Sequence, residues 1–222
     1  CYISLRKLPP YFEHKYRIVY SKIENVKTID DIMHPSVREA FKYLKVDYGV
    51  SVHHDGDIPA RSGMGSSSAF TVGLLNTVYA LKGKMTSKEE LAKEAVFVEQ
   101  RVIKENVGSQ DQVFAAHGGF NVIEFLQNGG ILVEPIIITP ERLKTFEDSL
   151  MLFFTGFSRI ASEFAESKIE NIPNNEHNLS QMSDLVDEAH KIITSPNRNL
   201  SEIGERLNET WELKKKLSDK IT

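Results

Sequence analysis

Apolar and polar residues follow two different periods along this chain, and together they predict a mixture of strands and helices. β-branched and aromatic runs predict strands, whereas apolar positions three and four apart predict helices. The expected strands are Cys1–Leu5, Tyr16–Ser21, residues 49–54, and a hairpin of Val122–Phe125 and Ile131–Val133. The expected helices are Ser36–Leu44, a helix over Thr71–Leu81 whose start holds residues 66–68, Ser87–Lys104, a short helix behind Ser109, Ser158–Lys168, Leu179–Thr194 and Ser201–Lys220. Elements in this order favour the α+β class.

Local signals fix some of these limits and divide the chain. Ser87-x-x-Glu90 is a capping box that predicts a helix start. The polar residues that follow Pro140 mark a boundary, and the apolar run Ser149–Phe154 predicts a buried strand that opens a second domain. We therefore expect two domains, residues 1–145 and residues 146–222. Trp211 lies at helical spacing with other apolar residues of the last helix and is expected in the core.

A loop rich in glycine and serine joins the strand at 49–54 to the next helix. Gly63 and Gly65 allow the backbone to turn and to approach a ligand closely. Residues 66–68 are all serine and lie where the free amides and the positive end of a helix favour an anion. A plain linker with a serine cap explains the same composition. The loop is neither a Walker A motif, which needs Lys-Ser or Lys-Thr, nor a complete dinucleotide fingerprint.

Two carboxylates follow this loop in the sequence. Glu99 lies one turn after Ala95, at the edge of an apolar helix face, where a carboxylate is either paired with a cationic side chain or bound to a metal ion. Asp111 falls in the first turn of the short helix behind Ser109. Such a position suits a carboxylate that only complements the helix dipole, as well as one that takes part in chemistry. The residues alone leave both choices open.

Composition narrows the class of protein. The chain has 222 residues, is 41% hydrophobic and carries a net charge of −4 without a basic block, which argues against a nucleic-acid partner. No apolar run approaches the length of a membrane span. The one cysteine, Cys1, excludes an internal disulfide and fits a cytoplasmic protein. Because the chain starts within a strand-like run, we expect it to be a fragment.

The residues of the loop, taken together, form a motif that resembles one known protein family. Pro59-x-x-x-Gly63-Met64-Gly65 followed by Ser-Ser-Ser-Ala resembles the second signature of the GHMP kinases, with Met64 in place of the usual leucine. Gly108-x-x-Asp111-Gln112 resembles the segment that carries the catalytic aspartate of the same superfamily. Further stretches are similar to one branch, the D-glycero-D-manno-heptose 7-phosphate kinases. They are Ser4–Pro9, Ser66–Phe70, Gly118–Asn121, Phe154–Ala161 and Trp211–Leu217.

The resemblance implies a fold and a truncation. It implies an N-terminal domain like domain 2 of ribosomal protein S5 and a ferredoxin-like C-terminal domain, with the active site in the cleft between them. The family's N-terminal sugar-site segment and its C-terminal Gly-rich signature are absent from this sequence. The expected chain is therefore a two-domain GHMP kinase truncated at both ends.

The resemblance also implies a reaction and its residues. The γ-phosphoryl group of ATP would pass to the anomeric hydroxyl of a heptose 7-phosphate, for the synthesis of a nucleotide-activated heptose. The loop would bind ATP, Ser67 and Glu99 would hold Mg²⁺, Asp111 would take the hydroxyl proton, and Arg159 is the candidate for the phosphate of the sugar. The expected nucleotide-binding residues are Pro59, Ser62, Gly63, Met64, Gly65, Ser66, Ser67 and Ser68.

Other functions stay open on the sequence. A different acceptor, such as fucose, galactose or another sugar phosphate, would leave both signatures unchanged. A GHMP-fold protein that binds ATP without catalysis is a further alternative, although Ser67, Glu99 and Asp111 are all present. The expected partners are ATP and a sugar phosphate, without nucleic acid or membrane, and a homodimer is one option for the assembly.

Overall fold

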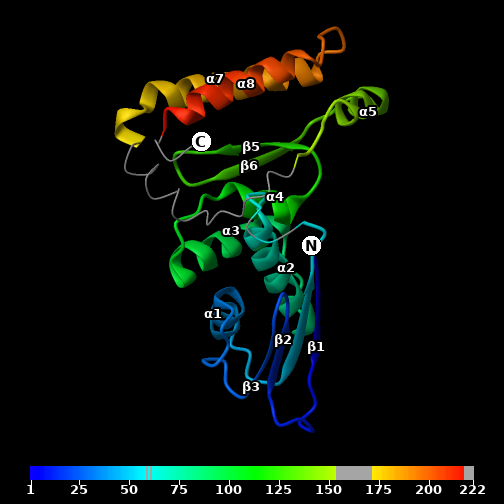
Figure 1. Ribbon diagram of the computed structural model, residues 1–222, viewed down its shortest axis with the longest axis vertical. Coiled ribbons are helices and arrows are strands. Elements are labelled where there is room, and N and C mark those ends of the chain that lie inside the picture. Colours follow the sequence, from blue (N-terminus) through cyan, green and yellow to red (C-terminus); the bar gives the residue numbers. More distant parts are fainter. Residues whose placement is uncertain (59, 61, 154–171, 218–222) are drawn as a thin grey trace. The chain divides into compact units, whose positions relative to one another are not determined.

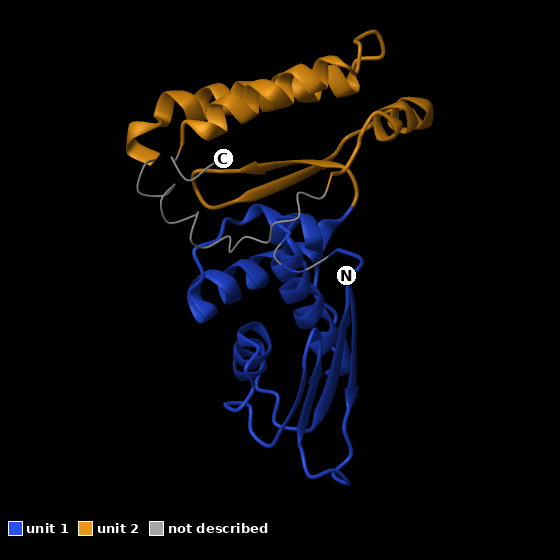
Figure 2. Cartoon of the chain, in the orientation of Figure 1, with its two compact units in different colours: residues 1–118, 158–161 blue, residues 119–157, 162–222 orange. Residues whose placement is uncertain are grey.

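The computed structural model describes residues 1–58, 60, 62–153 and 172–217. The described chain divides into two compact units, shown in Figure 2. Unit 1 holds residues 1–118 and unit 2 begins at Gly119. In this division the hairpin after Gly119 belongs with the helices that follow it. A division by contacts does not test a domain boundary, so the expected limit at residue 145 stays a prediction.

Unit 1 contains a four-stranded sheet and the helices that pack with it (Figure 1). The order of the strands in the sheet is β1-β4-β2-β3. β4 pairs antiparallel with β1 and parallel with β2, and β2 pairs antiparallel with β3. The strands are β1 (Tyr2–Lys7), β2 (Tyr16–Val19), β3 (Ile23–Val26) and β4 (Val50–Asp55). β4 is thus an interior strand, and its C-terminal end leads into the glycine-rich loop.

The helices of unit 1 are α1 (Pro35–Tyr43), α2 (Ser66–Leu81), α3 (Lys88–Phe97) and α4 (Gln110–His117). Between α3 and α4 the backbone forms a π-helix, η1 (Val98–Ile103). α2 approaches β1 closely, since a Cβ added at Gly73 would lie 3.0 Å from Cδ1 of Ile3. The apolar core is shared by the sheet and by α1, α2, α3 and η1, and its fully buried members include Ile18, Phe41, Val52, Leu74, Leu75 and Val98. This core fixes α2, and with it the loop at its N-terminal end.

Unit 2 contains an antiparallel hairpin and helices. Its elements are β5 (Asn121–Phe125), β6 (Ile131–Pro135), α5 (Pro140–Asp148), the 3-10 turn η2 (Ile172–Asn174), α7 (Glu176–Thr194) and α8 (Glu202–Lys215). α7 and α8 lie side by side (Figure 1). Ile192, Ile193 and Ile203 form a small core with Phe120 and Phe146 among its neighbours, so one cluster joins both helices to α5 and to residues that flank the hairpin.

Several expectations from the sequence are confirmed, and others are wrong. The α+β class, the loop between a strand and α2, the capping box at Ser87 and the hairpin are present. The strand expected at Ser149–Phe154 is absent over its described residues, where Leu150–Phe153 are exposed and irregular. The polar residues after Pro140 form α5. Trp211 is 40% exposed and therefore is not a core residue. The helix expected at Ser158–Lys168 lies outside the described residues.

Candidate active site

The N-terminal end of α2 is built to present backbone amides. Gly63 and Gly65 both adopt positive φ, 76° and 69°, a region that side chains disfavour, and Gly65 is the N-cap of α2. The first hydrogen bond of the helix runs from the Ala69 amide to the Gly65 carbonyl at 2.9 Å. The amides of residues 66–68 therefore precede the helical ladder, and glycine has no side chain with which to cap them. This arrangement suits an anion such as phosphate.

The fold brings Asp111 to this loop. A Cβ added at Gly65 would lie 3.1 Å from Cγ of Asp111 and 3.3 Å from its Oδ2, so the carboxylate rests directly against the glycine backbone. Asp111 occupies the first turn of α4, which packs against α2, and its side chain is exposed. An accessible carboxylate thus lies beside the loop, although Gly65 and Asp111 are 46 positions apart in the sequence.

Glu99 is buried beside the start of α2. It lies in the π-helix η1 and is 1% exposed. The Ser68 hydroxyl donates to its Oε2 at 2.9 Å, and the Gln112 side-chain amide donates to the same oxygen. The other oxygen, Oε1, is buried and has no hydrogen-bond partner among the described residues. Burial, together with the negative charge of Glu99, raises the pKa of Glu105 nearby.

These observations test whether the residues fit a divalent cation. A buried carboxylate with one bare oxygen is costly, and a cation or a cation-bound water would offset that cost. Within the described part of the chain, no three His, Cys, Asp or Glu side chains gather as a metal-binding cluster, so Glu99 offers a single carboxylate. Mg²⁺ accepts such a set, since it takes one or two protein oxygens together with phosphates and water. The residues fit Mg²⁺ held with a phosphate ligand.

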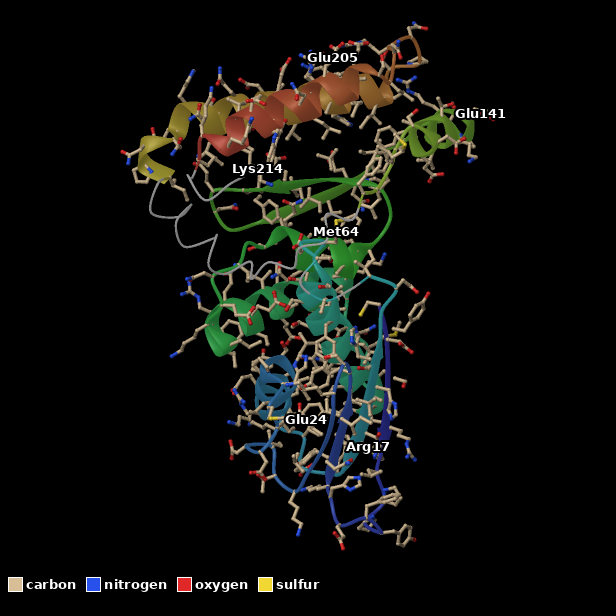
Figure 3. All side chains as sticks on the ribbon, viewed as in Figure 1. Arg17, Glu24, Met64, Glu141, Glu205 and Lys214 are labelled. Atoms are coloured by element: carbon tan, nitrogen blue, oxygen red, sulfur yellow. The ribbon has the colours of Figure 1, made fainter. Side chains whose placement is uncertain are left out.

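Most of the expected site residues lie at the loop and the start of α2, and two lie outside the described residues. Gly63, Gly65 and the three serines form one loop and helix start beside Asp111, and Met64 is exposed at this loop (labelled in Figure 3). The Ser62 hydroxyl is buried without a partner among the described residues. Pro59 and Arg159 lie outside the described residues.

The serine that contacts Glu99 directly is Ser68. The resemblance assigns Ser67 and Glu99 to one Mg²⁺ ion, and the described hydrogen bond from a serine to Glu99 comes from Ser68. Successive residues of a helix point about 100° apart, and it is Ser68 that faces inward, buried, while Ser67 is exposed. The role of Ser67 at a metal ion stays a prediction.

Gln112 is a site residue to which the sequence assigned no role. It is 1% exposed and contacts Glu99 across 13 residues of sequence. The available signal was a polar residue directly after Asp111, at a position that also belongs to the buried face of α4 with Val113.

Comparison with known proteins shows which proteins this chain is similar to. Residues 35–119, from α1 to the end of α4, match the family described as GHMP kinases N terminal domain. The D-glycero-alpha-D-manno-heptose 7-phosphate kinase of Campylobacter jejuni is 28% identical over 181 residues, which are 81% of this chain and 53% of that protein. The mevalonate kinase of Pyrococcus horikoshii is 30% identical over 167 residues, 72% of this chain and 46% of that protein.

Solved structures give the same result for the fold. The D-glycero-D-manno-heptose 1-phosphate kinase of Bacteroides thetaiotaomicron superimposes with a TM-score of 0.71 at 22% identity, over 96% of this chain and 67% of that one. The mevalonate kinase of Methanococcus jannaschii superimposes with a TM-score of 0.65 at 20% identity, over 97% of this chain and 68% of that one.

The chain thus has the α+β fold of these solved kinases, and residues 35–119 match the GHMP kinases N-terminal domain. Its similarity to heptose phosphate kinases bears out the resemblance to that branch. The chain spans about half the length of the heptose and mevalonate kinases it matches in sequence. None of the helices in the described residues is long and apolar enough to cross a bilayer.

Proposed function

We propose that the protein carrying this chain is an ATP-dependent sugar kinase that phosphorylates the anomeric hydroxyl of D-glycero-D-manno-heptose 7-phosphate. The observation that carries the proposal is one constellation: a phosphate-type loop at the start of α2, Asp111 against Gly65, and the buried Glu99 with a bare oxygen. Phosphoryl transfer asks a protein mainly for positioning and for neutralisation of charge. The loop amides and Asp111 would serve positioning, and a cation held by Glu99 would neutralise charge.

In this reaction the loop would bind the phosphates of ATP through the amides of Ser66, Ser67 and Ser68. Glu99, with the Ser67 hydroxyl as a second ligand, would hold Mg²⁺. When bound, the ion screens the charge of the phosphates. Asp111 would accept the proton of the attacking hydroxyl, so that the new O–P bond forms as the bond to ADP breaks. An anomeric hydroxyl is more acidic than an ordinary alcohol, which suits a carboxylate base.

The identity of the acceptor sugar has less support than the kinase reaction itself. Support for heptose 7-phosphate is the similarity to the Campylobacter jejuni heptose kinase, at 28% identity. The fucokinase of Bacteroides fragilis, which is also an L-fucose-1-P guanylyltransferase, is 26% identical, and the Pyrococcus horikoshii mevalonate kinase is 30% identical. A second acceptor class therefore belongs in every test. Arg159 remains our candidate for binding the sugar phosphate, and the need for ATP makes the cytoplasm the proposed location.

The test is a phosphorus NMR assay on the whole protein with Mg-ATP and one acceptor at a time. The acceptors are heptose 7-phosphate, fucose, galactose and mevalonate, and Asp111→Asn is the matched variant. We expect a new anomeric phosphate signal with heptose 7-phosphate alone, reduced at least about 100-fold by Asp111→Asn. Turnover of another acceptor would retain the kinase and replace its substrate. ATP binding without turnover of any acceptor would favour a protein that binds ATP without catalysis.

A further inference from the structure

Gln112 is buried in a place where an amide has an incomplete set of partners. Its Nε2 donates to Oε2 of Glu99, while its own Oε1 is buried without a partner among the described residues. A buried acceptor without a donor destabilises a fold, because it has lost its hydrogen bonds to water. An apolar side chain of the same size would avoid that cost if the position served packing alone.

The hydrogen bonds to Glu99 are asymmetric. Ser68 from α2 and Gln112 from α4 both donate to Oε2, and neither donates to Oε1. Two donors from two different helices fix the rotation of the carboxylate group. The result is a carboxylate with one oxygen secured by the protein and the other left for a ligand.

The backbone around Glu99 is also special. Val98 and Glu99 are adjacent, and both are buried. They begin the π-helix η1, a form that is rare and is found frequently at functional sites. Glu99 is thereby held from its backbone by η1 and from its side chain by α2 and α4.

We propose that Gln112 is a positioning residue for a metal ion at Glu99. Its amide N–H fixes Oε2 so that Oε1 is presented to the ion, and its amide oxygen is the acceptor for a water of the ion's hydration shell. The proposal rests on the proposed function, because it assigns Glu99 to the Mg²⁺ of phosphoryl transfer. Partners that orient a metal ligand change metal affinity about 10- to 100-fold when they are removed.

The test measures metal binding without turnover. Mn²⁺ replaces Mg²⁺, and its free concentration is followed by electron paramagnetic resonance in the whole protein with the non-hydrolysable analogue AMP-PNP. Gln112→Met keeps the length of the side chain and removes the N–H donor. Gln110→Met is the matched control, since Gln110 lies on the same helix and is exposed.

We expect Gln112→Met to raise the Mn²⁺ dissociation constant about 10-fold or more and Gln110→Met to change it less than about 2-fold. The Mg²⁺ concentration that half-saturates turnover should rise in parallel, with the KM of the sugar unchanged. A Gln112→Met protein that is folded and binds Mn²⁺ like the wild type would overturn the proposal. So would a wild-type protein that binds no Mn²⁺.

A second variant tests the same carboxylate in case Gln112→Met does not fold. Ser68→Ala removes the other donor to Oε2, and its effect on Mn²⁺ binding should not add to that of Gln112→Met, because both act through one carboxylate. Strictly additive effects would overturn the shared role. If the wild type binds Mn²⁺ and phosphorylates no acceptor, the proposed function fails, while the effect of Gln112→Met on binding still decides the role of Gln112.

Discussion

Replacement of Gly65 by alanine tests the link between the loop and Asp111. An alanine at φ 69° is strained by about 1 kcal/mol, because its Cβ crowds the following carbonyl oxygen. That Cβ would also lie 3.1 Å from Cγ of Asp111, whereas ordinary contact begins at 3.4 Å, so the carboxylate must retreat by roughly 0.3 Å. Asp111 is exposed and is able to move, so most of this effect should fall on its position.

The chain offers two matched glycines. Gly63 has φ 76° and Gly83 has φ 71°, and a Cβ at either would meet nothing within 4 Å. All three alanine variants therefore carry the same backbone strain, and we expect each to lose about 1 kcal/mol of unfolding free energy, with Gly65→Ala the largest, at up to about 2. Gly83 lies just beyond the C-terminal end of α2, so Gly83→Ala should retain full activity.

The activity of Gly65→Ala should fall far more than its stability. A misplacement of 1 Å can cost an enzyme about 100-fold, so a shift of a few tenths of an ångström predicts a loss of kcat of at least several-fold. Urea unfolding followed by circular dichroism gives the stability, and a coupled ADP-release assay gives kcat and KM. A folded Gly65→Ala enzyme with the kcat of Gly83→Ala would refute the role of this contact.

Three further predictions concern stability. Ser87→Ala removes the capping hydrogen bond to the Glu90 amide and should cost about 1 kcal/mol in urea unfolding, with Thr at the same position restoring most of it. Arg142→Met removes bonds to the carbonyls of Ile192 and Ile193 (2.6 and 2.7 Å) and should cost about 2 kcal/mol; a loss below about 0.5 would contradict this helix-capping role. Burial and a hydrogen bond to Glu24 raise the pKa of Tyr20 from 10.0 to about 12. The folded state then holds the phenolic proton more tightly than the unfolded state, so the stability that Tyr20 contributes is complete below pH 10 and is lost as the pH rises to 12. The difference in unfolding free energy between wild type and Tyr20→Phe should be constant up to pH 10 and change above it, and a flat difference throughout would contradict the shift.

Local sequence signals were reliable wherever they act within a few residues. The capping box at Ser87 formed because its two hydrogen bonds join residues three apart. The hairpin formed around Asn128-Gly129, where Gly129 takes a positive φ of 82° and relieves the turn. The glycine-rich loop leads into α2 at Gly65, the N-cap, which adopts the left-handed region that glycine allows. These features need no knowledge of the rest of the molecule.

Signals that depend on distant partners were less reliable. The apolar run Leu150–Phe153 predicted a buried strand, but a strand forms only where a neighbour supplies its hydrogen bonds, and the described residues show none there. β3 was missed because its side chains alternate weakly and its existence depends on pairing with β2. Trp211 followed helical spacing, yet periodicity does not say which face of α8 is covered.

The candidate site divides in the same way. The loop, the helix start and the two carboxylates, Glu99 and Asp111, are recognisable without a structure, because each is a local pattern of residue types. Three contacts become visible only in the folded chain: Asp111 rests on Gly65, Ser68 is the serine which contacts Glu99, and Gln112 contacts the same carboxylate. These contacts join residues 13 to 46 positions apart, and their geometry depends on how α2, η1 and α4 pack, which no short pattern encodes.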